Sequence, residues 1–313
     1  DLTWIKVRDD TESHGWYDAV RGALYRIQSN STSASTSVAS TVTGWTSDGF
    51  SLGADNEVNG SGKNYVGWNW KANGLGSSNT DGSINSTYTS ANTTSKCSIV
   101  KWVGTGANAT VGHGLGVVPT TVWVKNLDTT DSWMVWHKGL AGTHYLAFNT
   151  TAGDANGGSG PWNSTIPNAT VFSLGNYNET NKASSNMIAY VFSDVQGYSK
   201  INRYSGNGNT DGTFVYTGHK PAFVMIKCAS HPSTDWVTYD NKRSGYNGDN
   251  RLVYPNLSNA EEAGSALPID ILSNGFKPRT TANLINANGY NYFYWSFAEA
   301  PLVGTNNVPA NAR

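Results

Sequence analysis

Aromatic side chains in turn-like segments are the residues of this sequence best suited to chemistry. Several Trp and Tyr residues lie beside Gly, Asn or Asp instead of inside apolar runs. Sugar rings stack their apolar faces on such side chains, while amides and carboxylates bind the hydroxyl groups. The candidate glycan-binding residues are Trp45, Trp162, Asn163, Tyr177, Tyr246, Asp249 and Tyr290. The alternative is that these rings bury area within their own fold, as large side chains usually do.

Groups that could carry out catalysis are sparse. The 6 His residues show no metal-ligand spacing, and only 22 residues are acidic. A glycosidase needs two positioned carboxylates. Asp18 and Asp240 occupy equivalent positions in the first and third of the internal copies described below, and the second copy has His137 there. Such a repeated position indicates a role in the scaffold. We therefore predict a non-enzymatic protein with no metal and no cofactor, with a carbohydrate-active enzyme as the alternative.

Two further patterns have structural explanations. Residues 206–212 combine Gly with Asn, Thr and Asp, as calcium loops do, but lack the closing bidentate acid, so a hairpin turn is favoured. The two cysteines, Cys97 and Cys228, lie in strand-like surroundings and cannot form a disulfide framework. We expect two unpaired thiols.

The composition is typical of an all-β protein. It includes 12 Trp, 16 Tyr and 34 Gly, and Asn, Ser and Thr fill the spaces between apolar runs. The 21 basic residues nearly balance the acidic ones, which gives no electrostatic footprint for nucleic acid. No apolar run is long enough to span a bilayer, so membrane insertion is not expected.

An ordered set of features recurs three times along the chain. Each copy opens with an apolar stretch closed by a lysine: Trp4-Ile5-Lys6, Trp123-Val124-Lys125 and Met225-Ile226-Lys227. A turn with Asn follows at 30–32, 149–151 and 256–258, then a Phe at 50, 172 and 276. Each copy closes with an aromatic strand, at residues 64–70, 186–192 and 291–297. A period of roughly 100 residues is far above solenoid length, so each copy should be a domain.

These features predict three tandem antiparallel β-sandwich repeats of jelly-roll-like form. Copy 1 spans residues 1–94 and ends in a Ser/Asn/Thr-rich linker from residue 73, in which Ile84 and Tyr88 could form a short strand. Copy 2 spans 95–196, and copy 3 spans 197–313 with a polar C-terminal tail. Copies 2 and 3 begin with an extra strand, at 97–103 and 199–204, that copy 1 lacks. We expect an open sheet edge in copy 1, completed by upstream sequence or another subunit.

Two finer expectations concern local structure. We expect the closing strands to carry core aromatics, with Trp68, Tyr190 and Trp295 facing the Phe residues at 50, 172 and 276. The strongest helical stretch is residues 259–263, a turn or two in length.

The copies resemble a repeat of large structural and tail-fibre-like proteins of marine bacteriophages, cyanophages especially. The resemblance covers nearly the whole chain. It rests on residues 20–22 after Trp4-Ile5-Lys6, and on the stretches 47–53, 59–70, 104–116 and 297–301.

The resemblance implies a virion structural protein, a fibre or surface appendage, at the virion surface or extracellular. The expected partners are other virion proteins and further copies in a homo-oligomer such as a trimer, with adhesion to a host-surface glycan. A purely architectural capsid decoration or spacer is the third alternative.

Overall fold

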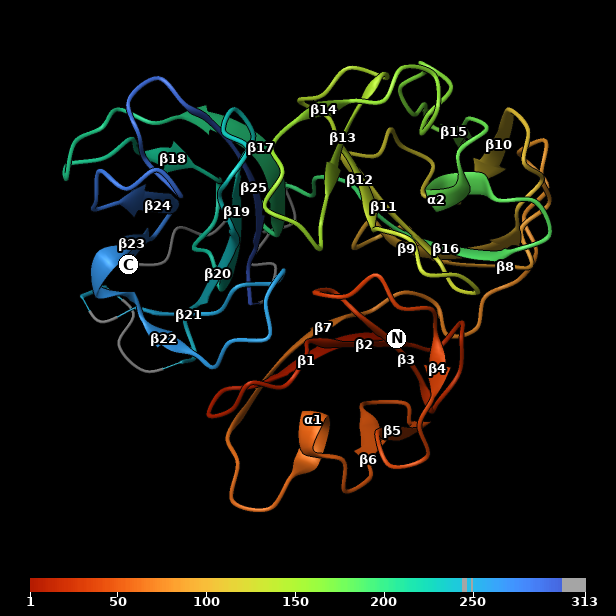
Figure 1. Ribbon diagram of the computed structural model, residues 1–313, viewed down its shortest axis with the longest axis horizontal. Coiled ribbons are helices and arrows are strands. Elements are labelled where there is room, and N and C mark those ends of the chain that lie inside the picture. Colours follow the sequence, from red (N-terminus) through yellow and green to blue (C-terminus); the bar gives the residue numbers. More distant parts are fainter. Residues whose placement is uncertain (244–246, 249, 300–313) are drawn as a thin grey trace. The chain divides into compact units, whose positions relative to one another are not determined.

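The computed structural model describes residues 1–243, 247–248 and 250–299 and is all-β, with antiparallel pairing in every sheet (Figure 1). The chain divides into two compact units. Unit 1 comprises Asp1–Asn149, Ala155–Phe192 and Asn256–Ala260. Unit 2 comprises the described residues of Thr150–Asp154, Ser193–Pro255 and Glu261–Arg313. Copies 1 and 2 of the sequence therefore share one compact unit.

The first sheet of unit 1 belongs to copy 1. Its strand order is β4 (Thr36–Ser37), β3 (Tyr25–Gln28), β2 (Gly15–Asp18), β1 (Leu2–Val7) and β7 (Tyr65–Trp70). A separate hairpin joins β5 (Val42–Trp45) to β6 (Phe50–Leu52), and the four-residue helix α1 (Asn56–Asn59) follows.

The second sheet of unit 1 has seven strands and belongs mainly to copy 2. Its order is β14 (Ala155–Asn156), β13 (His144–Ala147), β12 (Met134–His137), β11 (Thr121–Asn126), β16 (Asn186–Phe192), β9 (Cys97–Val103) and β8 (Tyr88–Asn92). A smaller sheet pairs β10 (Ala109–Gly112) with β15 (Val171–Leu174), and the helix α2 (Asn178–Asn181) follows.

Unit 2 has a larger and a smaller sheet with a shared core. The larger sheet has the order β17 (Ser199–Ser205), β25 (Asn291–Phe297), β19 (Phe223–Cys228) and β20 (Trp236–Asp240). The smaller has the order β18 (Val215–Tyr216), β24 (Gly275–Pro278) and β23 (Ile269–Leu272). Val224 and Ile226 of β19 belong to the same buried cluster as Ile269 and Phe276. A short pair, β21 (Arg251–Leu252) with β22 (Glu262–Ala263), and the 3-10 helix Gly264–Ala266 complete the unit.

The lysines that close the opening strands occupy the same position in all three copies, as the sequence predicts. Each is the fifth residue of a six-residue strand, namely β1, β11 or β19. Each also lies at the same register against its closing strand, with the pairs Lys6–Val66, Lys125–Ile188 and Lys227–Phe293. The opening and closing strands therefore pair identically in the three copies.

All three lysine side chains are buried and donate to backbone carbonyls. Lys6 Nζ donates to the oxygens of Val7 (2.7 Å) and Asp10 (2.9 Å). Lys125 Nζ donates to Asn126 O at 2.8 Å and to Thr32 O of copy 1 at 3.1 Å. Burial lowers the pKa of each lysine from 10.5 to about 8.

Within unit 2, Lys227 Nζ donates to Thr151 O at 2.9 Å and also to Thr234 O. Thr151 and Thr32 stand at the same place in their copies, the third residue of the turn that begins with Asn. Each of these two lysines therefore binds the turn of the preceding copy. Such an ammonium satisfies several carbonyls at once, which fits a structural role.

An aromatic cluster joins copies 1 and 2 inside unit 1. The ring of Trp16 lies 5.8 Å from that of Trp123, 5.2 Å from Trp133 and 5.0 Å from Tyr190. These four rings are at most 3% exposed. Offset and edge-on aromatic pairs of this kind stabilise beyond the area they bury.

The expected pairing of Phe172 with Tyr190 and of Phe276 with Trp295 was wrong. Tyr190 and Trp295 are buried as predicted, but Phe172 packs on Trp102 (5.7 Å between rings) and Phe276 on Tyr294 (5.4 Å). Successive strand residues point to opposite faces, so Phe276 meets Tyr294, the residue before the predicted Trp295. Phe172 meets Trp102 of β9, which pairs with Met187 and not with Tyr190. Tyr190 belongs to the aromatic cluster instead, and within unit 2 the ring of Trp295 lies 5.3 Å from that of Trp236.

Two local expectations can be compared with the structure. The Ser/Asn/Thr-rich stretch after residue 73 is more than a linker and forms a strand at Tyr88, as the alternative allowed: it provides β8, which pairs with β9 from Tyr88–Lys101 to Asn92–Cys97. Residues 259–263 form no helix; Glu262–Ala263 is strand β22. Cross-strand pairing overrides weak local propensity in both places. Both cysteines are buried free thiols, as expected.

The outer edge of β7 distinguishes copy 1 from the other two. In copies 2 and 3 the closing strand is covered on that side, because β16 pairs with β9 and β25 pairs with β17 over seven residues each. Among the described residues, the sheet of copy 1 ends at β7. The expected open edge is therefore present there.

Candidate functional site

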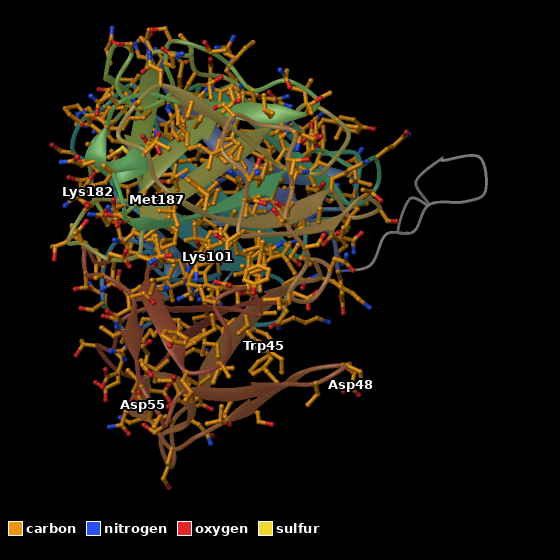
Figure 2. All side chains as sticks on the ribbon, turned by 90° about the vertical axis from the view of Figure 1, so that its right-hand side faces the viewer. Trp45, Asp48, Asp55, Lys101, Lys182 and Met187 are labelled. Atoms are coloured by element: carbon orange, nitrogen blue, oxygen red, sulfur yellow. The ribbon has the colours of Figure 1, made fainter. Side chains whose placement is uncertain are left out.

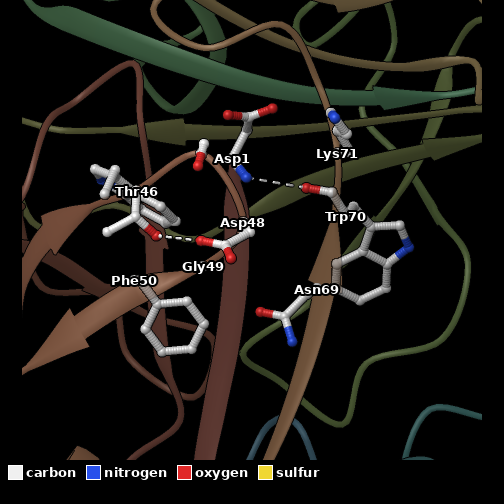
Figure 3. Close-up of a pocket in the computed structure, with 10 residues that line it drawn as sticks. Asp1, Thr46, Asp48, Gly49, Phe50, Asn69, Trp70 and Lys71 are labelled. Atoms are coloured by element: carbon white, nitrogen blue, oxygen red, sulfur yellow. Dashed lines mark hydrogen bonds between the residues drawn. The ribbon is translucent and has the colours of Figure 1, made fainter.

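A cleft of about 490 Å³ lies in copy 1, entirely within unit 1 (Figure 3). One wall is the β5–β6 hairpin, which carries Trp45 and Asp48 near its tip (Figure 2). The other wall is the end of β7. The lining residues are Asp1, Trp45, Thr46, Ser47, Asp48, Gly49, Phe50, Asn69, Trp70 and Lys71.

The hairpin wall is shaped by a short turn. Thr46 N donates to Gly49 O at 2.9 Å, and the Thr46 hydroxyl donates to Asp48 Oδ1 at 3.2 Å. The rings of Trp45 and Phe50 flank this turn 6.1 Å apart in an edge-on arrangement. Both rings are partly buried against the small core beneath them. The turn therefore holds two aromatic surfaces and one carboxylate together.

The strand wall places an amide, an indole and an ammonium in sequence. Trp70 is 7% exposed, while Asn69 and Lys71 on either side are exposed. The backbone nitrogen of Asp1 donates to Trp70 O at 3.3 Å, and Asp1 Oδ2 accepts from Ala72 N at 2.9 Å. These bonds fix the end of β7 beside β1.

The cleft combines aromatic surfaces with polar and charged groups. Partly exposed aromatic rings offer stacking surfaces, and Asp48, Asn69 and Lys71 supply hydrogen-bond acceptors and donors for hydroxyl groups. The hairpin residues 46–49 that line the cleft are exposed to solvent. Of the residues proposed from the sequence, Trp45 is the one that the structure places here.

The sequence did not indicate Asn69, Trp70 or Lys71. These residues lie more than 20 positions from Trp45 and come from a different sheet. The turn around Asp48 and Gly49 was a detectable signal, since Asp-Gly between apolar residues favours a hairpin.

The candidates from copy 2 lie elsewhere. Trp162 is 2% exposed and donates its indole N–H to His144 O at 3.1 Å, so it packs inside its own loop and offers no ring face to a sugar. Asn163 follows it in a left-handed conformation with φ of 49°. Tyr177 is half-buried beside Tyr145, with 6.5 Å between the rings, and burial raises its pKa to about 12.

Of the three candidates from copy 3, Tyr290 lies among the described residues. Tyr290 in unit 2 stacks on His231 at 5.5 Å, and its carbonyl accepts from Gly206 N at 2.9 Å. Tyr246 and Asp249 lie outside the described residues. Within unit 1, the cleft around Trp45 does not include Trp162, Asn163 or Tyr177.

Two buried ion pairs outside the cleft are structural. Asp18 is buried, and its Oδ2 accepts from Arg21 Nε at 2.5 Å and from the Tyr190 hydroxyl at 2.6 Å. Unit 2 repeats the pair, with Arg243 Nε 2.7 Å from Asp240 Oδ2. This equivalence supports the scaffold role expected for Asp18 and Asp240.

Glu57 is another buried carboxylate, and its pKa is raised because burial disfavours the charged form. It accepts from the Tyr17 hydroxyl at 3.1 Å, Arg26 at 3.0 Å and Gln28 at 2.6 Å. Three donors occupy its oxygens, so Glu57 serves to bind β2 and β3 to α1.

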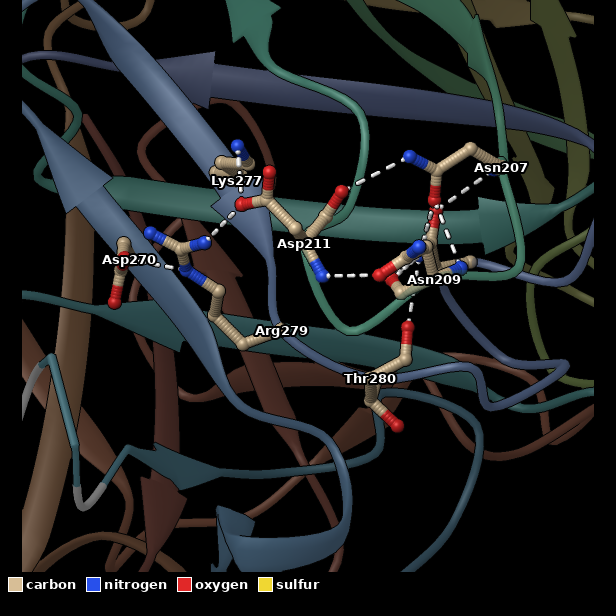
Figure 4. A network of polar contacts seen from close by, with 8 residues as sticks. Asn207, Asn209, Asp211, Asp270, Lys277, Arg279 and Thr280 are labelled. Atoms are coloured by element: carbon tan, nitrogen blue, oxygen red, sulfur yellow. Dashed lines mark hydrogen bonds and ion pairs between the residues drawn. The ribbon is translucent and has the colours of Figure 1, made fainter.

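The loop at residues 206–212 uses its oxygens internally (Figure 4). Asp211 Oδ1 lies 2.6 Å from both Lys277 Nζ and Arg279 Nη1. Asn286 Nδ2 donates to Asn207 Oδ1 (3.0 Å) and Asn209 O (2.8 Å). In the part of the chain that the structure describes, no group of three or more His, Cys, Asp or Glu residues could hold a metal ion. Nor does any described helix combine the length and apolarity needed to cross a membrane.

The fold and the cleft define an all-β protein with an open, aromatic-lined surface site. The sequence matches the family described as Domain of unknown function (DUF7483) over residues 1–301, so the chain belongs to this family. No curated protein matches it, and no solved structure does.

Proposed function

We propose that this chain is a non-enzymatic structural protein of a bacteriophage particle that adheres to a host-surface glycan through the cleft in copy 1. The observation that carries the adhesion is the cleft itself, with Trp45 and Phe50 on one wall and Asn69 and Lys71 on the other. Stacking surfaces next to amide and charged groups match the two faces of a sugar ring.

The setting on a virus particle rests on the resemblance of the three copies to repeats of phage structural and tail-fibre-like proteins. In this proposal each copy is a jelly-roll-like β-sandwich, and the copies are arranged in tandem at the virion surface. The identical register of Lys6, Lys125 and Lys227 against their closing strands supports a common unit. Other virion proteins and further copies of the chain, in a homo-oligomer such as a trimer, are the proposed partners.

A glycan array followed by titration calorimetry tests the adhesion. The protein should bind a subset of saccharides, and Trp45→Ala should weaken that binding at least tenfold because it removes the stacking surface. Trp162→Phe is the matched control, because Trp162 is buried outside the cleft. Absence of saccharide binding, or equal binding by Trp45→Ala, would contradict the proposal and leave the purely architectural role.

Glycoside hydrolysis is a second candidate, favoured by one observation. Asp1 and Asp48 both line the cleft, and hydrolysis requires two carboxylates facing one bond. Incubation with a labelled saccharide that the protein binds should then release product, and Asp48→Asn should abolish release without abolishing binding. Binding without any turnover would eliminate this candidate.

A further inference from the structure

The backbone of β7 presents unused hydrogen-bonding groups at its outer edge. Arg8 N donates to Asn64 O at one end of the β1–β7 ladder, and Asp1 N donates to Trp70 O at the other. Because backbone groups alternate in direction along a strand, Tyr65, Gly67 and Asn69 point theirs away from β1. Within the described residues, these three have no backbone partner on that side.

The corresponding positions in copies 2 and 3 are paired. Met187, Ala189 and Val191 of β16 face β9, and the equivalent residues of β25 face β17. Burial follows the pairing, because Ile188 and Ala189 are 0% exposed while Val66 is half-buried and Gly67 is exposed. The outer edge of β7 therefore corresponds to the edge that β9 and β17 occupy in copies 2 and 3, but no described strand pairs with it.

One asparagine stands at the same position in all three copies and points to a contact just beyond the edge strand. Asn59, Asn181 and Asn286 each stand five residues before the Asn that precedes or opens the closing strand (64 − 59, 186 − 181 and 291 − 286). Asn181 is buried and binds the segment after β9: Thr105 N donates to its Oδ1 at 2.9 Å, and its Nδ2 donates to Ala107 O at 2.6 Å.

Asn286 does the same for the segment after β17. Asn207 N donates to its Oδ1 at 3.1 Å, and its Nδ2 donates to Asn209 O at 2.8 Å. In copy 1, Asn59 is exposed, and its Nδ2 donates to Gly53 O of its own loop at 3.0 Å. The side chain that clamps the loop in the other copies is therefore present in copy 1 with its outer partner missing among the described residues.

We propose that the outer edge of β7 accepts an antiparallel strand of the type of β9 and β17, and that Asn59 clamps the residues after it. The strand that fits this edge has seven residues and is followed by Gly and then by Thr or Asn, as in Val103-Gly104-Thr105 and Ser205-Gly206-Asn207. Strand addition to an exposed edge satisfies its amides and carbonyls and is a recurrent mode of peptide recognition.

The occupant is polypeptide joined ahead of residue 1. In both complete copies the edge strand comes from the segment just before the opening strand, at the same separation: 121 − 103 and 223 − 205 both equal 18. A strand that ends 18 positions before the start of β1 can reach the edge of β7 through a connection of the same length as in copies 2 and 3. This inference does not depend on the sugar-binding proposal.

The test joins residues 97–119 ahead of Asp1, which reproduces that separation before β1. Hydrogen exchange should slow at least tenfold at Tyr65, Gly67 and Asn69 relative to the unextended protein. Gly67→Pro removes one outward N–H at a position where an added Cβ meets nothing within 4 Å, so it should abolish the protection while β1 stays protected. Gly67→Ala, which keeps the N–H, is the matched control and should retain the protection.

Two outcomes overturn the inference. Unchanged exchange at the three residues in a folded extended protein would show that the edge does not accept the strand. Protection by a free peptide of residues 97–108, with none from the extension, would show that the strand comes from another chain.

Asn69 belongs both to this edge and to the cleft, so one measurement separates the two proposals. If the extended protein shows the protection and still binds the saccharide in a Trp45-dependent way, both hold. If it shows the protection but has lost saccharide binding, the strand inference holds and the sugar site fails. Saccharide binding without protection gives the reverse result.

Discussion

Replacing Phe172 by alanine should destabilise unit 1 far more than the matched replacement of Phe50, its counterpart in copy 1. Phe172 is fully buried, and its ring meets that of Trp102 on β9 at 5.7 Å. Phe50 is only partly buried, and its ring partner is Trp45 on its own hairpin. The difference arises because β9 covers Phe172, while the sheet of copy 1 ends at β7 among the described residues.

The magnitude follows from burial. Truncating a fully buried Phe costs about 3–5 kcal/mol, which combines lost transfer free energy with the cavity left behind. The edge-on contact of Phe172 with Trp102 accounts for about 1 kcal/mol of this. Phe50 has less area to lose, so its truncation should cost on the order of 1–2 kcal/mol. Phe276, fully buried in unit 2, should again cost about 3–5 kcal/mol.

Hydrogen exchange measured by mass spectrometry across a urea series can follow the two units separately. Peptides from β11 report on unit 1 and peptides from β19 on unit 2. Phe172→Ala should lower the urea midpoint of the β11 peptides and leave that of the β19 peptides unchanged, and Phe276→Ala should do the opposite. Equal costs for Phe50→Ala and Phe172→Ala would refute the reasoning that the edge strand decides the burial of this position.

Three further predictions concern polar groups. Tyr190→Phe should destabilise unit 1 by about 1–3 kcal/mol, measured by the same exchange assay, because it removes a donor from buried Asp18. The pKa of Lys125 is about 8 in the folded protein against 10.5 ordinarily, so a protonated Lys125 disfavours folding. This cost to the free energy of folding is about 3 kcal/mol, and it should disappear as the pH rises from 8 to 10.5. Stability of unit 1 should therefore rise over that window by more than in Lys125→Met, and parallel profiles would contradict this. Asp211→Asn should leave the melting of unit 2 nearly unchanged, and adding calcium should not shift the wild-type melting curve; a calcium-dependent increase would reinstate a metal loop at Asp211.

The sequence predicted the elements that repeat. The apolar stretches closed by Lys6, Lys125 and Lys227 form matching strands at one register, because strand formation here depends on a local alternation that three copies display. Both cysteines are unpaired and Asp18 belongs to the scaffold, and these features were also readable from residue type and position. A pattern that recurs in three copies predicts a strand more reliably than a single occurrence, because one short apolar run is ambiguous.

Tertiary contacts decided the features that the local pattern could not. The low-apolar stretch after residue 73 became β8 because β9 offered it an edge, and no property of its own composition requires that. Phe172 packs on Trp102 of β9 instead of Tyr190 of β16 because successive residues of a strand point to opposite faces, and the sequence does not show which face each aromatic takes.

The cleft was the least predictable feature. Trp45 could be suggested from an aromatic next to a turn, but so could Trp162, which is buried. The exposure of these two rings differs because other parts of the fold cover Trp162 and leave Trp45 partly exposed. Asn69 and Lys71 join Trp45 because a hairpin and a strand end from separate sheets meet at one edge. Residue types and repeats are written in the sequence, but which faces stay open depends on which strands lie beside them, and only the folded chain determines that.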